Sequence, residues 1–303
     1  MNDSLASADA SPAGREALEK MGRFLTQAIF LEVSVHPKPG LVTRFGNGAH
    51  RDMSILTFAM SSAVLSKSFY DLLAMGAAHE GALPQLFAKA RRYGELSERE
   101  LLESTKNVNT QRGILFSGGI LSLAAGVMLK DNITASVENI CQSVRALTAG
   151  LVERELCCLA AKRRLTVGEL LFKKHKITGI RGEVEKGFPS VAATGLPALR
   201  EAFGRGADLN DALAHTLLAL MTVVEDSNVV WRSGYGKLPY VQAAASSILE
   251  AGSVFTGCGR SLLDRTAAKF AKDRISPGGS ADLLAITVAL YLLENRQFPV
   301  AII

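Results

Sequence analysis

Apolar residues recur at helical spacing along most of this chain, and this pattern constrains the fold more than any other feature. Over residues 15–34, for example, Leu18 and Leu25 fall on one predicted helical face. Runs of β-branched residues are scarce, and 48% of the 303 residues are hydrophobic, which favours helices around a large core. The sequence therefore predicts an all-α fold. Residues 15–303 are expected to form a single multi-helix globular domain, and residues 1–14, rich in Ser, Ala and Asp, are expected to form a disordered N-terminal tail.

One stretch, residues 32–53, interrupts the helical pattern and has the composition of a constrained loop. Pro37 and Pro39 remove two backbone donors and fix φ, so an extended chain is expected there. Loops of this kind on a helical scaffold often bind phosphorylated ligands, although a plain connector with solvated charges fits the spacing equally well. The charged side chains of the stretch are Glu32, Lys38, Arg44, His50, Arg51 and Asp52.

The middle of the chain is predicted to alternate between helices and turns. The segment starting at Ser97 has the form of a capping box and predicts a helix start. Asn109 or Thr110 is a natural N-cap for the apolar helix that follows, and the free amides of such a start can also bind an anion. One long helix is predicted over residues 135–164, and a second charged, glycine-rich loop over residues 178–197.

Acidic residues near two predicted helix ends suggest a metal. Glu225 and Asp226 end a predicted helix, where the helix dipole disfavours carboxylates unless a cation lies nearby. Mg²⁺ accepts carboxylates beside phosphate oxygens, although a solvated surface turn remains the alternative. Ser280 is predicted to cap the last helix, which places Asp282 in its first turn, where a carboxylate is favourable without any function.

Composition argues against several other classes. The net charge is +5, but no basic stripe with interleaved aromatic residues is present, so no nucleic-acid partner is predicted. The four cysteines lack C-x-x-C spacing, which predicts neither a zinc site nor a disulfide framework and fits a cytoplasmic protein. The longest uncharged run, residues 113–129, is interrupted by Ser and Gly and predicts a buried core helix rather than a membrane span.

Four segments, in order, resemble the signature motifs of triphosphoribosyl-dephospho-CoA synthases. They are EVSVHPKPGLVTRFGNGAHRDM from Glu32, NTQRG from Asn109, GEVEKG from Gly182 and SPGGSAD from Ser276. The resemblance implies transfer of the 5-triphosphoribosyl group of ATP to the ribose 2′-hydroxyl of 3′-dephospho-CoA, with release of adenine and with Mg²⁺ as the expected cofactor. It also implies that the product is the precursor of the prosthetic group of a malonate decarboxylase or citrate lyase acyl carrier protein, and it allows a homo-oligomer.

Residue roles follow from that reaction, because breaking the bond from ribose C1′ to adenine builds positive charge on the sugar. A carboxylate near C1′ would stabilise this charge or accept the hydroxyl proton, and the candidates are interchangeable in these roles. The predicted catalytic residues are Glu32, Asp52 and Glu183, and the predicted metal ligands are Asp226 and Asp282. The predicted substrate-binding residues are Lys38, Arg44, His50, Asn109, Thr110, Arg112, Arg181, Asn228, Arg232 and Ser280.

The chain departs from the family pattern at several positions. Thr43 stands where an aspartate is expected, Gln111 where a histidine is expected, and Glu225 where a glycine is expected. The amide at position 111 removes one candidate acid for adenine departure, and Thr43 removes a candidate metal ligand or base. Two alternatives stay open: a ribosyl transferase on the same scaffold with a different acceptor, and a catalytically silent nucleotide-binding protein.

Overall fold

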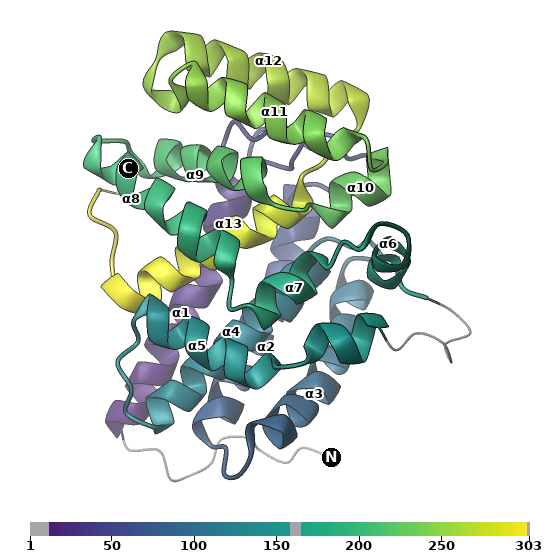
Figure 1. The fold of residues 1–303 in the computed structure, drawn as a ribbon. Helices are drawn as coiled ribbons and strands as arrows, with labels where there is room; N and C mark the ends of the chain where they lie inside the picture. The colour runs from purple at the N-terminus through teal and green to yellow at the C-terminus, as the bar shows by residue number, and fades with distance from the viewer. Residues whose placement is uncertain (1–11, 158–164, 302–303) are drawn as a thin grey trace.

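Helices account for nearly all regular structure in the computed structural model, which describes residues 12–157 and 165–301 (Figure 1). Within these residues the only β pairing is an isolated bridge between Thr43 and Gly46, so the predicted all-α fold class is confirmed. The helices are α1 Pro12–Ser34, α2 Ile55–Ala77, α3 Leu83–Ser104, α4 Arg112–Lys130, α5 Val137–Thr148, α6 Val167–His175, α7 Gly179–Glu185, α8 Leu196–Gly204, α9 Leu209–Val223, α10 Ser227–Ser233, α11 Lys237–Glu250, α12 Gly257–Asp273 and α13 Gly278–Asn295. Two π-helical turns, Glu153–Cys157 and Val191–Gly195, and a 3₁₀ turn, Ser253–Phe255, complete the order.

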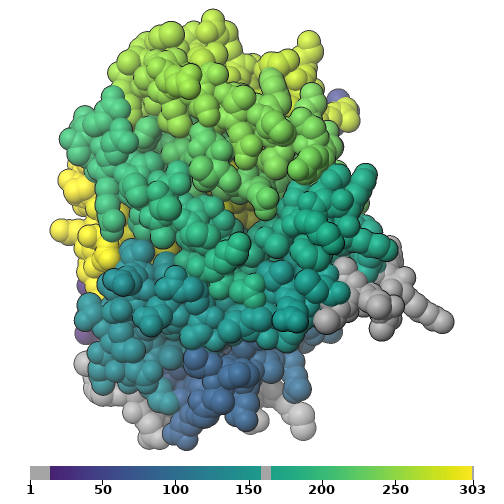
Figure 2. All heavy atoms as spheres, viewed as in Figure 1, coloured from purple at the N-terminus to yellow at the C-terminus, as the bar shows by residue number. Residues whose placement is uncertain are grey.

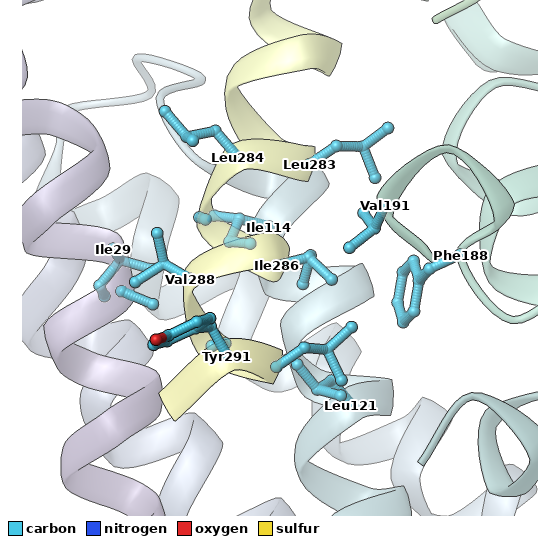
Figure 3. Close-up of a cluster of buried hydrophobic side chains, with 14 of the residues drawn as sticks. Ile29, Ile114, Leu121, Phe188, Val191, Leu283, Leu284, Ile286, Val288 and Tyr291 are labelled. Atoms are coloured by element: carbon cyan, nitrogen blue, oxygen red, sulfur yellow. The ribbon is translucent and has the colours of Figure 1, made fainter. Parts of the chain in front are cut away.

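The last helix, α13, lies at the centre of the molecule. Every residue from Leu283 to Leu293 is buried, as expected for a helix that is apolar on all sides. α1, α4 and α9 pack around it. Figure 3 shows Leu283 on the side of Val191 and Val288 on the side of Ile29 in α1. One core cluster thus joins the first helix to the last.

Other helices form the two ends of the molecule and cover this centre. α11 and α12 lie side by side over α9 at one end, and α3 lies at the other (Figure 1). Figure 2 shows that green and teal segments cover most of α13 on this face, so that yellow C-terminal residues reach the surface mainly along one side.

Helices α2 and α4 pack backbone against backbone. A Cβ atom at Gly126 would lie 2.0 Å from the carbonyl oxygen of Leu73, and one at Gly76 would lie 2.3 Å from the carbonyl oxygen of Leu123. No side chain fits at either position, so these two glycines set the distance between the helices.

Helix α4 was predicted to be a core helix. Among the described residues it is the only single helix with the length and composition of a membrane span, and 72% of its apolar window is buried inside the protein. α9 and α10 pass the same test only as one broken span bent by 72°. The burial of α4 agrees with the core interpretation.

Several predicted boundaries are wrong. The long helix over residues 135–164 ends at Thr148, because Ala149 has an extended ψ of 128° and Gly150 a φ of +74°. Residues 158–164 lie outside the described part. Ser97 does not begin a helix, since it is buried within α3. The stretch 178–197, predicted to be a loop, instead contains α7, a π-helical turn and the start of α8.

The predicted N-terminal tail falls mostly outside the described residues. α1 begins at Pro12, three residues before the predicted start of the first helix at Arg15.

We expect Gly126→Ala to lower the free energy of unfolding by about 1–3 kcal/mol, because α2 and α4 must separate to admit the methyl group. Gly94→Ala in α3 is the matched control: no atom lies within 4 Å of its Cβ position, so a gain of about 0.5–1 kcal/mol is expected. Urea unfolding followed by circular dichroism measures both. Equal effects of the two substitutions would contradict close packing at Gly126.

Candidate active site

A cavity of about 680 Å³ opens beside the first turns of α4 and α13. Its wall also includes residues of α7, α10 and the loop that follows α1. The N-terminal ends of α4 and α13 direct free backbone amides and the positive end of the helix dipole toward this region, which favours an anionic ligand. The cavity thus lies where the sequence predicted interruptions of the helical pattern.

Most of the predicted site residues meet in this cavity, although they come from segments far apart in the sequence. Asn109 and Thr110 precede α4, and the buried Thr110 hydroxyl has no hydrogen-bond partner among the described residues, so it is available to a ligand. The predicted residues that line the cavity are Glu32, His50, Asn109, Thr110, Arg112, Glu183, Asn228, Arg232 and Asp282.

Three predicted phosphate-binding cations do not line the cavity. Lys38 is buried, and its ammonium donates to the carbonyl oxygen and the carboxylate of Glu32, each at 2.5 Å. Burial lowers the pKa of Lys38, and the Glu32 carboxylate partly offsets this effect. Lys38 therefore orients Glu32, the partner that does face the cavity.

The other two cations, Arg44 and Arg181, form contacts away from the cavity. Arg44 is exposed and lies over the ring of Phe45, 5.0 Å from its centroid. Arg181 on α7 forms an ion pair with Glu155, with its Nε 2.7 Å from Oε2. Nothing in their placement brings either guanidinium to the cavity wall.

Asp226 caps α10 and ties it to α13. Its Oδ1 accepts from the amides of Asn228 and Val229 at 3.0 and 3.2 Å, and its Oδ2 accepts from the amide and hydroxyl of Ser280 at 2.8 and 3.0 Å. The prediction that Ser280 caps the last helix is wrong: α13 begins one turn earlier, with Pro277 at the N-cap position, and Ser280 donates to Asp226 instead. Neither residue lines the cavity, and the acceptor positions of Asp226 are filled by protein donors.

The environment of Asp282 is the opposite of that of Asp226. Its carboxylate faces the cavity and accepts no hydrogen bond from any described residue. Burial, with the nearby carboxylates Glu32 and Asp226, raises the pKa of Asp282 well above its ordinary value. Protein atoms surround the group densely, although part of its surface remains open to the cavity. A Cβ at Gly113 would lie 1.9 Å from its Oδ2, so the start of α4 packs directly against this carboxylate.

Glu183 is a second carboxyl with altered acidity in the cavity wall. Its oxygens accept from the Ser190 hydroxyl at 2.5 Å and the Ser190 amide at 3.2 Å. Burial nevertheless raises the pKa of Glu183, and the nearby Glu225 adds to this effect while Lys186 opposes it.

His50 lies in the wall with Asp52 behind it. The imidazole Nε2 is 2.9 Å from the hydroxyl of Ser276, another wall residue. Asp52 is exposed and outside the cavity, with one oxygen 3.7 Å from His50 Nδ1 and the other 3.9 Å from Arg232. The predicted catalytic carboxylate Asp52 therefore reaches the cavity only through other side chains.

Ser276, Lys186, Trp231 and Gln111 line the cavity, although sequence reasoning did not name them as site candidates. Ser276 opens the SPGGSAD motif, and Lys186 lies in the GEVEKG motif, so both carried a signal. Trp231, the only tryptophan of the chain, is 54% exposed at the wall, between the predicted residues Asn228 and Arg232 on α10. Gln111 is buried and accepts hydrogen bonds from Ser61 and, at 3.3 Å, from Ser62.

In class, this is an α-helical protein in which helix starts, cations and carboxylates surround one cavity, the arrangement of an enzyme that acts on a phosphorylated ligand. The chain belongs to the CitG family of ATP:dephospho-CoA triphosphoribosyl transferases, which it matches over residues 18–298. No solved structure matches it.

Curated relatives agree with this family. The chain is 41% identical over 284 residues to a probable 2-(5''-triphosphoribosyl)-3'-dephosphocoenzyme-A synthase of Malonomonas rubra, covering 92% of this chain and 89% of the relative. It is 39% identical to the synthase of Pectobacterium atrosepticum, with 91% and 90% coverage, and 36% identical to that of Klebsiella pneumoniae, with 89% of each chain covered.

We expect Asp282→Asn to stabilise the ligand-free protein by about 0.5–2 kcal/mol at pH 7.5 in EDTA, because the amide removes an unpaired buried charge. A carboxyl whose pKa is higher in the folded protein stabilises it only while protonated. The wild type should therefore lose this stability as the pH rises from the unfolded pKa, near 3.8, through the raised folded pKa, and the gain from the substitution should grow over the same range.

Asp226→Asn is the contrasting variant. It leaves backbone donors without a full set of acceptors and should lower the free energy of unfolding by about 1–3 kcal/mol. Thermal unfolding at several pH values measures both. A similar loss in both variants would contradict the distinction between the unpaired Asp282 and the fully bonded Asp226.

Proposed function

We propose that this chain transfers the 5-triphosphoribosyl group of ATP to the 2′-hydroxyl of 3′-dephospho-CoA and releases adenine. Family membership over nearly the whole chain supports the activity. The single structural observation that supports it best is the unpaired Asp282 carboxylate in a cavity that also holds cations and helix starts. The substrate carries anionic phosphates and develops positive charge at C1′. Cations and helix starts suit the phosphates, and a carboxylate suits C1′.

The triphosphate is held rather than cleaved in this reaction. Arg112, Lys186 and Arg232 supply positive charge at the cavity wall. Arg112 is paired with Glu98 at the surface, a contact that a phosphate group can replace. Because the triphosphate stays attached to the ribose, charge and position are sufficient, and no P-loop is required.

The carboxyl groups suit the ribose and the departing base. Glu32, held in place by Lys38, and Asp282 can stabilise positive charge that develops at C1′. Glu183 can hold a proton closer to neutral pH than an ordinary carboxyl, so it suits protonation of adenine as the C1′–N9 bond breaks.

Mg²⁺ is the expected cofactor, and Asp282 with Glu32 would hold it. The described residues contain no group of three or more His, Cys, Asp or Glu side chains arranged for a metal, so most ligands would come from the triphosphate and water. The unpaired Asp282 carboxylate fits such a role, whereas the predicted ligand Asp226 is occupied by protein donors. When bound, Mg²⁺ would neutralise phosphate charge.

The cellular setting follows from the family resemblance. We place the reaction in the cytoplasm, with its product passed on to an acyl carrier protein of malonate decarboxylase or citrate lyase.

The direct test is incubation with ATP, Mg²⁺ and 3′-dephospho-CoA, following free adenine by chromatography and the adduct by mass. We expect equimolar adenine and triphosphoribosyl adduct. Adenine without the adduct would favour another acceptor or water. No adenine from a folded protein that still binds ATP would favour the silent nucleotide-binding alternative.

We expect Trp231 to stack on an adenine ring, because a half-exposed indole at a nucleotide cavity is a platform for a base. Trp231→Ala should weaken binding of ATP or dephospho-CoA by about 5- to 150-fold, the equivalent of ~1–3 kcal/mol of stacking, while Trp231→Phe should keep most of the affinity.

Its fluorescence is a direct readout, since the chain has no other tryptophan. Separate titrations with ATP and with dephospho-CoA identify which adenine quenches it. Phe45→Ala, at a ring that is 72% exposed and outside the cavity wall, should leave both affinities unchanged. No quenching by either ligand would rule out the stacking role.

A further inference from the structure

We propose that Ser276 and His50 together accept the proton of the acceptor 2′-hydroxyl, and that Asp52 positions His50 for this role. The inference rests on the proposed triphosphoribosyl transfer and assigns its base, a role that the resemblance left open among carboxylates.

The two proposed proton carriers meet at the cavity wall from distant parts of the chain. His50 belongs to the loop after α1, and Ser276 to the turn that precedes α13. His50 Nε2 and Ser276 Oγ are 2.9 Å apart. The His50 side chain is 6% exposed and Ser276 3% exposed, so bulk water has little access to the pair. A histidine hydrogen-bonded to a hydroxyl that faces a ligand cavity is the arrangement that activates a hydroxyl.

The Asp52 carboxylate favours the tautomer of His50 that can accept a proton at Nε2. Asp52 Oδ1 faces His50 Nδ1 at 3.7 Å, and this buried nitrogen has no hydrogen-bond partner among the described residues. A proton on Nδ1 is therefore favoured by the adjacent negative charge, which leaves Nε2 to accept from Ser276. Catalytic hydrogen bonds are often long before substrate binds, so the 3.7 Å separation suits a contact that shortens as the imidazole gains charge.

Two charged residues face the ring and act in opposite directions. Burial and the Arg232 guanidinium lower the pKa of His50, and Asp52 partly offsets them. The imidazole is consequently neutral near pH 7, the form that can accept a proton. Arg232 also lies 3.9 Å from Asp52, so the two charged groups are linked to one another as well as to the ring.

Other groups in the wall suit the base role less well. Glu32 already binds Lys38, and Asp282 is the carboxylate assigned above to Mg²⁺. The amide of Gln111 cannot take up a proton near neutral pH. His50 is the only histidine in the wall, among the residues the structure describes.

The transfer balances with these groups. O2′ of the acceptor bonds to C1′ of ATP while the C1′–N9 bond breaks and its electron pair leaves with adenine. The O2′ proton passes to Ser276 Oγ as Ser276 passes its own proton to His50 Nε2. A protonated acid in the wall, such as Glu183, gives adenine the proton that it takes up, and exchange with water then restores both groups.

The test compares variants under saturating ATP, Mg²⁺ and dephospho-CoA. His50→Gln should lower kcat by about 10²- to 10⁴-fold, the usual range for a lost general base. Ser276→Ala should follow the same direction, and Ser276→Thr, which keeps the hydroxyl, should recover most of the rate. Quenching of Trp231 by the nucleotide that quenches it in the wild type should be unchanged in all three, which shows that the fold and that binding site are intact.

The chain offers a matched control pair outside the cavity. His215 Nδ1 and Ser253 Oγ are 2.8 Å apart, both residues are buried, and Glu201 lies 3.9 Å from Nε2. Ser253→Ala removes a similar buried hydrogen bond without touching the cavity, so its kcat should stay within about twofold of the wild type, since its hydroxyl lies away from the reacting groups.

Titration of His50 in the ligand-free protein provides a readout that a purely structural hydrogen bond would not share. The chain has five histidines, so NMR can follow each, with His50→Gln identifying the resonance. Asp52→Asn should lower the pKa of His50, and Arg232→Met should raise it. The acid limb of kcat/KM should move the same way in each variant, toward lower and higher pH respectively.

Two results would overturn the proposal: kcat of His50→Gln or Ser276→Ala within about threefold of the wild type, or an acid limb that does not move with the measured pKa of His50. Failure of the wild type to form the adduct would instead refute the triphosphoribosyl transfer, and the assignment of its base would fall with it.

Discussion

Four hydrogen bonds accepted by the Asp226 carboxylate join α10 to the first turn of α13, and the geometry of the cavity depends on this connection. Two bonds come from the start of α10 and two from Ser280. α13 cannot shift to follow a ligand, because it is buried along its length. Asp226 therefore holds α10, and with it Trp231 and Arg232, at a fixed place beside the apolar core.

The same packing leaves the Asp282 carboxylate without a hydrogen-bond partner among the described residues. The carboxylates of Glu32, Asp226 and Asp282 lie close enough to influence one another, yet Lys38 and Ser280 serve only the first two. A protein selected for stability alone would place an uncharged residue at position 282. An anionic group that is costly in the free protein and stabilised by a bound cation or a developing sugar cation is instead what a binding and catalytic site requires.

The fold class was predictable because apolar periodicity is a local property of the sequence, whereas chain breaks and side-chain directions are not. Gly150, just past the C-cap of α5, is a local signal for a helix end, but apolar residues continue beyond it at helical spacing, and this spacing predicted one long helix. The motifs located the cavity, but Arg181 forms an ion pair with Glu155. Lys186, five residues further along the chain, lines the cavity instead. Which cation of a motif reaches the ligand depends on such tertiary ion pairs.

Position 111 shows how a change within a motif can alter proton chemistry without altering the fold. The family pattern led us to expect a histidine there, and Gln111 occupies the place with its carbonyl oxygen held by Ser61 and Ser62. Its remaining amide hydrogens can bind a ligand atom but cannot be given up as protons. In the proposed reaction, protonation of adenine then falls to a carboxyl that keeps its proton, for which Glu183 has the raised pKa. His50 remains the only imidazole among the described wall residues, so the proposed acid and base are two different kinds of group.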